Sequence, residues 1–367
     1  MPTSLGPNTY NDSIIFNYDT GDITNSYKGE PTTNLLSSYF NTNYVLAGGE
    51  FSQYADLAPI FNTYGYGSSY SYSLSLDMKV NNNGGVLVYM QNGSYTKYSF
   101  VYQSVNATKE YQRFKFEGLN ANLSTPSETA AILAFYTGYG SGVNPTVKNV
   151  QVELKSHSTP YINGTRSATQ GLLDISGKNN TITLANSYTS NAQITFDGTD
   201  DYIGVGNLGS VNDFTIEIMF KSDSVSNYRN PMDCNWLVYS GGYSNIGPRL
   251  EQNSSGNLGW VIGDSVGNYT GLNVISSGMS GTPYHYAAIT RVGSIFTSYY
   301  NGQQVTSTTF NNWYGSFSNV TFGRGFSASS ERWFSGQIPI AKIYNRILTS
   351  AEIANNYRQY KSRFNLS

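Results

Sequence analysis

Paired carboxylates on one strand face are the residues with which a β-strand protein would hydrolyse a glycosidic bond. Asp213 and Glu217, in the segment DFTIEIMF, come nearest to that arrangement, four residues apart. Asp200 and Asp201 are adjacent, so on a strand they would point to opposite faces. We interpret Asp213 as a residue at the start of a strand and Glu217 as a lone acid on its solvent-facing side. The sequence therefore predicts no catalytic residues and no enzyme.

Histidine and cysteine chemistry is not indicated either. His157 and His285 are the two histidines, and a zinc site would need further ligands that the pattern does not offer. The chain has no nucleophile-elbow motif of the kind that places a reactive serine. Cys234 is the single cysteine, so these residues can form no disulfide among themselves and no thiolate metal cluster. This cysteine usage favours folding in a reducing cytosol.

Aromatic residues point to a different chemistry, because an amphipathic ring can stack on the apolar face of a sugar. Trp236 and Trp260 fall in strand patterns and are expected in the core. Trp313 lies in a polar stretch, where we expect its ring to be exposed, and a Gly/Ser/Tyr-rich segment earlier in the chain offers further rings. The candidate carbohydrate-binding residues are Trp313, Tyr314, Tyr64, Tyr66 and Tyr70.

The composition limits the classes of partner. Only 12% of the 367 residues are charged and the net charge is −2, which gives no electrostatic case for nucleic acid. Asn, Ser, Thr, Gly and 32 tyrosines must supply the polar surface, a mixture that favours short strands and turns. The beginning, MPTSLGPNTYND, lacks the features of a signal peptide, and no apolar run is long enough to span a membrane.

The elements that would position these residues are strands. Tyr70–Met78 alternates with period two, and short apolar runs separated by turns continue to Leu154. Thr349 and Glu352 form a capping box that starts a helix over about 350–358. We predict an all-β protein of two antiparallel β-sandwich (jelly-roll) domains with one short C-terminal helix. The expected segments are an arm with a first strand (1–33), a first sandwich (34–156), a linker (157–170), a second sandwich (171–360) and a tail (361–367).

The second sandwich contains the most specific sequence motifs. Phe196-Asp197-Gly198-Thr199-Asp200-Asp201-Tyr202-Ile203, YHYAAITR at 284–291 and FTSYYNGQQV at 296–305 follow one another in order. Together they resemble the laminin-G-like jelly rolls of the concanavalin A-like class, as found in tailed-phage virion proteins. The chain departs from that pattern at Pro339 and Ile340, where the family usually has acidic residues.

The first sandwich resembles carbohydrate-binding-module-like jelly rolls of phage tail and fibre proteins, through Thr33–Leu36 and Val150–Tyr161. The pairing of the two resemblances implies a non-enzymatic structural protein on a tailed-phage virion: a head fibre, a decoration protein or a tail-associated fibre subunit. Its partners would be other virion proteins, its own copies, in a trimer or an array, and a glycan. It would be made in the host cytoplasm without a signal peptide. The alternative is a secreted or cell-surface glycan-binding lectin.

The laminin-G-like resemblance also bears on calcium, which such domains often bind through Asp, Asn and backbone oxygens. Asp197, Asp200 and Asp201 are the candidate ligands, and the alternative is that they serve the turn alone. The resemblance further suggests that this domain begins at Ser13–Tyr18 and resumes at Asp174. We therefore expect the first sandwich to be inserted into the second, with Ser13–Tyr18 paired inside the second.

Overall fold

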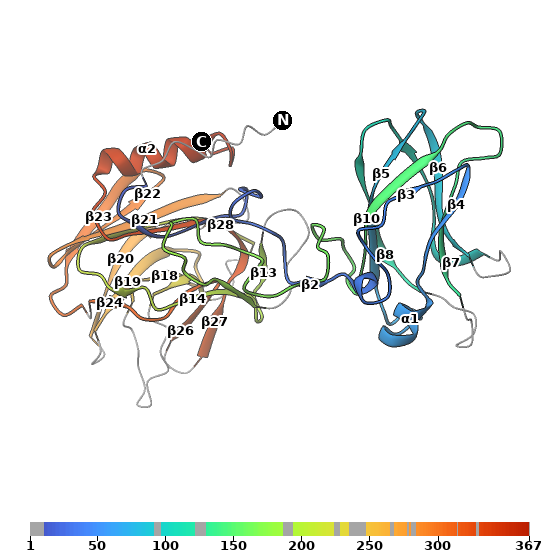
Figure 1. The fold of residues 1–367 in the computed structure, drawn as a ribbon. Coiled ribbons are helices and arrows are strands. Elements are labelled where there is room, and N and C mark those ends of the chain that lie inside the picture. The colour runs from blue at the N-terminus through green and yellow to red at the C-terminus, as the bar shows by residue number, and fades with distance from the viewer. Residues whose placement is uncertain are drawn as a thin grey trace. The chain divides into compact units, whose positions relative to one another are not determined.

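The computed structural model of the chain divides into two compact units (Figure 1). The split unit comprises residues 1–30 and 167–367, and the middle unit comprises residues 31–166. The structure describes residues 11–91, 97–121, 130–185, 194–223, 228–234, 247–264, 268–276, 279, 284–313, 315–327 and 330–366. The predicted class is confirmed, because these residues form mostly antiparallel strands arranged as sandwiches.

One sheet of the split unit contains the first and last strands of the chain. In spatial order it consists of β1 (Ile14–Asp19), β28 (Ser335–Tyr344), β16 (Phe214–Ser222), β21 (His285–Val292), β22 (Ile295–Tyr300) and β23 (Gln303–Thr309), with β13 (Thr195–Asp197) also paired to β28. Strand β1 runs antiparallel to β28, with Phe16 opposite Ile343 and Tyr18 opposite Ala341. Residues of the chain's beginning therefore complete a sheet made mainly by its second half.

The other sheet of the split unit carries the candidate site. Its strands, in spatial order, are β12 (Thr183–Ala185), β14 (Tyr202–Gly206), β25 (Val320–Phe322), β17 (Arg229–Asp233), β18 (Arg249–Gln252), β19 (Leu258–Gly263) and β20 (Tyr269–Ile275). Two short ladders accompany it: β15 (Gly209–Ser210) with β24 (Ser316–Phe317), and β26 (Arg324–Ser327) with β27 (Ser330–Trp333). Alternate residues of both sheets, among them Phe16, Ile216, Leu250 and Trp260, form one buried core.

The middle unit is a smaller sandwich. One sheet has the order β3 (Leu46–Ala47), β10 (Pro145–Glu153), β5 (Tyr72–Val80) and β8 (Gln112–Leu119). The other has the order β4 (Phe51–Asp56), β9 (Ile132–Tyr136), β6 (Gly84–Gln91) and β7 (Lys97–Ala107). Its core is separate from that of the split unit. Strands β2 (Thr32–Thr33) and β11 (Thr165–Arg166) pair where the chain enters and leaves this unit.

Helices are few in the part of the chain that the structure describes. The expected C-terminal helix is α2 (Ser350–Lys361), and the capping box of Thr349 and Glu352 is present. The helix ends three residues beyond the expected Arg358. Its own residues Tyr357 and Tyr360 are buried against the split unit. Sequence analysis missed α1 (Ala58–Tyr64) and the 3-10 turn η1 (Leu35–Ser38). The Asn92-Gly93 turn lies outside the described residues. None of the described helices has the length and apolar character to cross a membrane.

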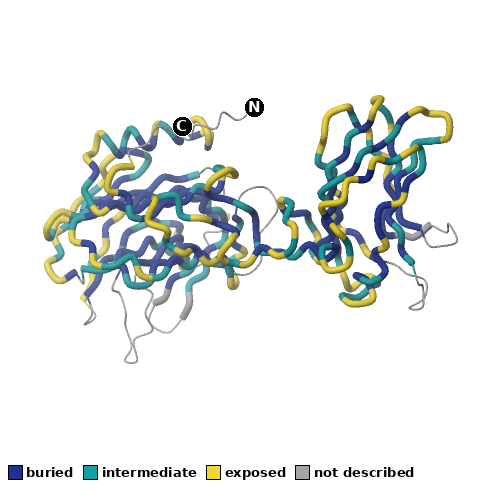
Figure 2. The backbone as a smooth tube through the Cα atoms, viewed as in Figure 1, coloured by how far each residue is buried: buried dark blue, intermediate teal, exposed yellow. Residues whose placement is uncertain are grey.

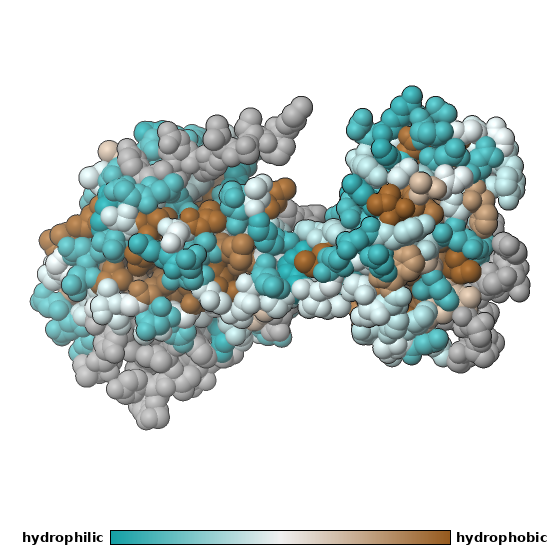
Figure 3. Space-filling model, viewed as in Figure 1, coloured by the Kyte–Doolittle hydropathy of each residue, from teal (hydrophilic) through white to brown (hydrophobic). Residues whose placement is uncertain are grey.

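Burial follows the strands in both units (Figure 2). On the face that Figure 3 shows, polar residues predominate, with smaller hydrophobic areas on each unit. This agrees with a chain whose surface relies on neutral polar side chains rather than on charge.

Candidate functional site

Asp213 and Glu217 do not form a catalytic pair. The carboxylate of Asp213 accepts the backbone N–H of Gly293 at 2.9 Å, next to the start of β16. The expectation that Glu217 faces solvent is wrong, because helix α2 covers that face of β16 and leaves Glu217 1% exposed. Tyr286 donates to Glu217 at 2.5 Å and Asn356 at 2.9 Å. Glu217 therefore anchors the helix to the sheet.

The environment of Glu217 has an electrostatic consequence. Burial raises the pKa of its carboxyl group, whereas the charge of Lys342 and the hydrogen bonds from Tyr286, Asn356 and Tyr344 act in the opposite direction. A buried acid that is enclosed by hydrogen bonds is positioned to hold structure rather than to reach a substrate.

Trp313 is not the exposed platform that its polar neighbours suggested. Its side chain is 8% exposed, and its indole N–H donates to the carbonyl of Gly247 at 3.0 Å. The ring packs against Phe214 and Phe317, with centroids 5.1 and 5.8 Å away. A sugar cannot stack on a ring that is already enclosed in the core. Tyr314 and Trp236 lie outside the described residues, and Trp260 is buried as expected.

The tyrosines that were candidate sugar contacts in the middle unit lie at the end of α1, where Tyr64 is the last residue, and in the turn that follows it. Tyr64 and Tyr66 pack partly buried against the core of that unit. Tyr70 is 39% exposed, and its ring lies directly over the backbone of Gly65. The structure thus places these rings close to one turn, and sugar contact there stays a prediction.

His285 is a core residue rather than a metal ligand. Its imidazole Nδ1 lies 2.8 Å from the hydroxyl of Tyr300, and its ring packs on Phe220. Burial lowers the pKa of His285 to about 4, so the ring is neutral at physiological pH.

The acidic turn brings its three carboxylates together. Ligand oxygens of Asp197, Asp200 and Asp201 all lie within 4.8 Å of one another. Asp201 accepts the backbone N–H of Asp197 at 2.8 Å, as expected for a residue that shapes the turn. The guanidinium of Arg229 lies against Gly198 in the middle of this turn. The oxygen set suits a hard cation such as calcium.

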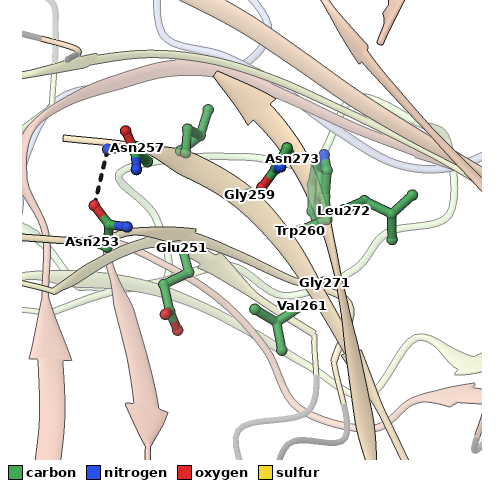
Figure 4. Close-up of a pocket in the computed structure, with 10 residues that line it drawn as sticks. Glu251, Asn253, Asn257, Gly259, Trp260, Val261, Gly271, Leu272 and Asn273 are labelled. Carbon is green, nitrogen blue, oxygen red and sulfur yellow. Dashed lines mark hydrogen bonds between the residues drawn. The ribbon is translucent and has the colours of Figure 1, made fainter. Parts of the chain in front are cut away.

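A separate hollow of about 170 Å³ lies over β18, β19 and β20 (Figure 4). The ladder aligns Glu251, Gly259 and Asn273 in one row across the three strands, and Val261 with Gly271 in the next. Gly259 leaves the middle of the first row without a side chain, and Gly271 leaves the β20 end of the second row without one. Three amide side chains, one carboxylate and one aliphatic group surround the exposed backbone: Asn253, Asn257, Asn273, Glu251 and Val261.

Local geometry holds the rim of the hollow. Asn253 accepts the backbone N–H groups of Ser255 and Asn257 at 2.9 and 3.0 Å, which fixes the turn between β18 and β19. Glu251 pairs with Arg249 at 2.9 Å and also with Arg332. Glu251 is the single carboxylate among the residues that line the hollow, and it is ion-paired with two guanidiniums. They lack the carboxylate pair that glycoside hydrolysis requires.

Aromatic rings and guanidiniums stack on one another around β26 and β27, and one of these guanidiniums, that of Arg332, binds Glu251 of the hollow. Arg332 lies over the ring of Tyr228 at 4.5 Å. Arg324 lies over both Tyr202 and Trp333, at 4.8 and 4.9 Å. Such cation–π contacts hold flat rings in fixed orientations.

Sequence reasoning missed the hollow. Its trace in the sequence is one glycine in the interior of each of two strands, Gly259 in Leu258–Gly263 and Gly271 in Tyr269–Ile275. An isolated strand glycine often marks a place where another group approaches the backbone.

Comparisons with known proteins found one sequence family and a group of solved structures that resemble parts of the chain. The sequence of residues 196–354 matches the concanavalin A-like lectin/glucanases superfamily. No curated protein matches the chain. Solved structures that resemble it include the receptor-binding domain of botulinum neurotoxin C/D mosaic serotype, at 16% identity, a TM-score of 0.40, and coverage of 52% of this chain and 48% of that one.

Two other solved structures are similar to the same degree. The botulinum neurotoxin serotype D binding domain is 18% identical with a TM-score of 0.41, covering 52% of this chain and 49% of that one. The binding domain of Paraclostridial Mosquitocidal Protein 1 is 17% identical with a TM-score of 0.39 and the same coverages. This chain spans about half the length of each of these structures. The sequence match alone makes residues 196–354 similar to a concanavalin A-like, laminin-G-like jelly roll.

Proposed function

We propose that the protein is a non-enzymatic carbohydrate-binding protein and that the split unit binds one sugar residue in the hollow over β18, β19 and β20. The observation that carries this proposal is that two strand glycines, Gly259 and Gly271, line the hollow together with three amide side chains. Glycine lets a ligand approach the strand backbone, and amides both donate to and accept from sugar hydroxyls.

The size of the hollow agrees with a small ligand. Pockets for drug-sized molecules have volumes of roughly 300–1,000 Å³, whereas this hollow has about 170 Å³. A single ring of an oligosaccharide is a better match than a large cofactor. The neutral amides and the ion-paired Glu251 favour a hydroxyl-rich ligand over a strongly charged one.

The test is to fill the hollow. A β-carbon at Gly271 meets its nearest neighbour, the carbonyl oxygen of Trp260, at 3.9 Å, so Gly271→Val adds bulk without a backbone clash. The variant should lose roughly tenfold or more in affinity on a glycan array followed by calorimetry. The matched control is Gly204→Val on β14, three strands away from β18 in the same sheet, where the nearest atom, Cε2 of Tyr202, is 3.4 Å away. Equal binding by both variants and the wild type would remove the hollow from the argument.

The enzyme alternative has its own assay, because the matched superfamily includes glucanases. Polysaccharides that the protein binds would be incubated with it and analysed for reducing ends. We expect none to form, since the lining residues of the hollow provide one carboxylate only. Product formation that Glu251→Gln abolishes would contradict the non-enzymatic assignment.

We propose further that the protein is exposed on a tailed-phage virion as a head fibre, a decoration protein or a tail-associated subunit. The support is the sequence resemblance of both sandwiches to phage domains, and the alternative is a secreted or cell-surface lectin. Mass spectrometry of purified particles distinguishes them. Self-association, as a trimer or an array, remains a prediction that analytical ultracentrifugation can check.

Calcium at Asp197, Asp200 and Asp201 also remains a prediction. Binding should raise the thermal midpoint of the split unit in proportion to the logarithm of calcium concentration above its dissociation constant. Asp200→Asn should reduce that rise. A midpoint that is the same in millimolar calcium and in chelator would leave the turn as the role of these residues.

A further inference from the structure

A second surface that could bind a ligand lies on the middle unit, on the outer face of the sheet β4-β9-β6-β7. The ladder aligns Phe51, Tyr136 and Leu87 in one row. The next row contains Gln53, Ala134, Tyr89 and Tyr102. These side chains point away from the core, which the alternating residues of the same strands fill, such as Val88 and Phe135. Neither row contains a charged residue.

Four tyrosines gather on this face, and we call Tyr89, Tyr102, Tyr136 and Tyr139 the tyrosine cluster. The rings of Tyr89 and Tyr102 are 6.3 Å apart, and those of Tyr136 and Tyr139 are 5.5 Å apart, both edge to face. Burial raises the pKa of Tyr89, and the nearby hydroxyls of Tyr139, Tyr102 and Tyr136 raise it further. Tyr102 is 51% exposed and Tyr139 is 79% exposed.

The loop that presents Tyr139 is held in place. The carboxylate of Glu50 accepts the backbone N–H groups of Gly140 and Gly142, each at 2.7 Å. Thr137, on the other side of Tyr139, donates to the carbonyl of Val143 at 2.7 Å. A large ring that is exposed on a fixed loop has lost conformational entropy without gaining burial. That arrangement is expected where the ring gains its contact from a ligand.

A buried amide that is bound to Tyr89 of the tyrosine cluster is the second sign of a ligand. The hydroxyl of Tyr89 donates to Oε1 of Gln91 at 3.0 Å, and Gln91 is 2% exposed. Among the described residues, Nε2 of Gln91 has no acceptor. A buried N–H group without an acceptor is costly, so an acceptor from outside the described residues is expected there.

We propose that the tyrosine cluster is a second carbohydrate-binding site and that its ligand is a neutral oligosaccharide. Two exposed rings, Tyr102 and Tyr139, supply apolar faces for pyranose stacking, and the phenol groups supply hydrogen bonds. The uncharged rows give no attraction for an acidic sugar or a phosphate. The inference rests on the proposed carbohydrate-binding function, but it concerns different residues in the other unit.

The experiment uses the full chain and a panel of neutral hexasaccharides, namely cello-, xylo-, manno- and malto-oligosaccharides, with oligogalacturonate as the acidic comparison. The strongest binder is then titrated by calorimetry. The double variant Tyr102→Ala/Tyr139→Ala should weaken its binding roughly tenfold or more, the loss expected for central aromatic contacts. Tyr139→Phe keeps the ring and should lose much less.

The controls separate this site from others. Tyr111→Ala removes a ring that is 38% exposed and adjoins β8 in the other sheet of the middle unit, and it should not change binding. Gly271→Val should not affect this ligand either, so failure of the hollow and failure of the tyrosine cluster are distinguishable. Circular dichroism establishes that each variant is folded.

Three outcomes would overturn the proposal: no neutral oligosaccharide binds, the double variant binds as well as the wild type, or only oligogalacturonate binds. Sedimentation of the same variants adds a fourth. A double variant that dissociates an oligomer while keeping its affinity for the sugar would assign the tyrosine cluster to contact with a second copy of the chain.

Discussion

Phe16→Ala should destabilise the split unit, although Phe16 lies before the middle unit in the sequence. The Phe16 side chain is fully buried, and its ring stacks on Phe322 with centroids 5.7 Å apart and 14° between the planes. Removing a buried phenylalanine costs about 3–5 kcal/mol. For a unit of this size, 1 kcal/mol corresponds to roughly 2–4 °C, so its thermal midpoint should fall by about 6–20 °C.

Tryptophan fluorescence makes the assay specific. All four tryptophans belong to the split unit: Trp236, Trp260, Trp313 and Trp333. Their emission therefore reports unfolding of that unit alone, whereas far-UV circular dichroism reports both units. Phe16→Ala should shift the fluorescence transition to lower temperature or lower denaturant concentration.

The matched control is Phe61→Ala. Phe61 is equally buried, but it packs on Tyr72 and Phe100 in the middle unit, at 5.3 and 4.9 Å. Its loss should move the circular dichroism signal without moving the fluorescence transition. If Phe61→Ala shifts the fluorescence as far as Phe16→Ala does, or if Phe16→Ala shifts nothing, the assignment of residues 13–18 to the second sandwich as a folding unit is refuted.

Three further predictions concern pH, the helix and the insertion. Burial lowers the pKa of His285 to about 4, so the folded state disfavours protonation of this ring. The neutral ring therefore contributes stability that is fully present above about pH 6.5 and is lost as the pH falls towards 4, by roughly 3 kcal/mol at most. His285→Phe removes the titrating group, so urea midpoints measured across that range should depend less on pH. Asn356→Leu removes a donor to the buried Glu217 and should cost about 1–3 kcal/mol, whereas an unchanged midpoint would mean that the helix does not depend on this anchor. Replacing residues 33–165 by Asn-Gly should leave a folded split unit with the native tryptophan emission maximum, since Thr32 and Arg166 are already ladder partners, and a molten product by near-UV circular dichroism would contradict it.

Local patterns predicted the fold class well. The alternation around Tyr72–Val80 and the apolar runs near Leu258–Gly263 and His285–Val292 became strands within two residues of their expected limits. The capping box of Thr349 and Glu352 is specific because both of its hydrogen bonds are local, and it places the start of α2 correctly. Local hydrogen-bonding rules are sufficient for such features.

The errors arise where distant segments meet. Glu217 looked solvent-exposed because β16 alone has one polar side, but α2, more than 100 residues later, covers that side. Trp313 looked exposed because its neighbours are polar, while Phe214 and Phe317 enclose it. Helix α1 was missed although Asp56 accepts the N–H of Ala58 at its start. Burial by a distant element leaves no periodic trace in the buried segment itself.

The pairing of β1 with β28 has a consequence for how the protein is made. Tyr18 donates to the carbonyl of Ile338, 320 residues further along the chain. At a synthesis rate of roughly 5–20 residues per second, β1 waits about 15–65 s on the ribosome before its partner strand exists. The middle unit is complete well before that time and can fold first. Until synthesis reaches β28, Phe16 and Tyr18 remain apolar side chains without their native partners, and a chaperone or a neighbouring nascent chain can bind them.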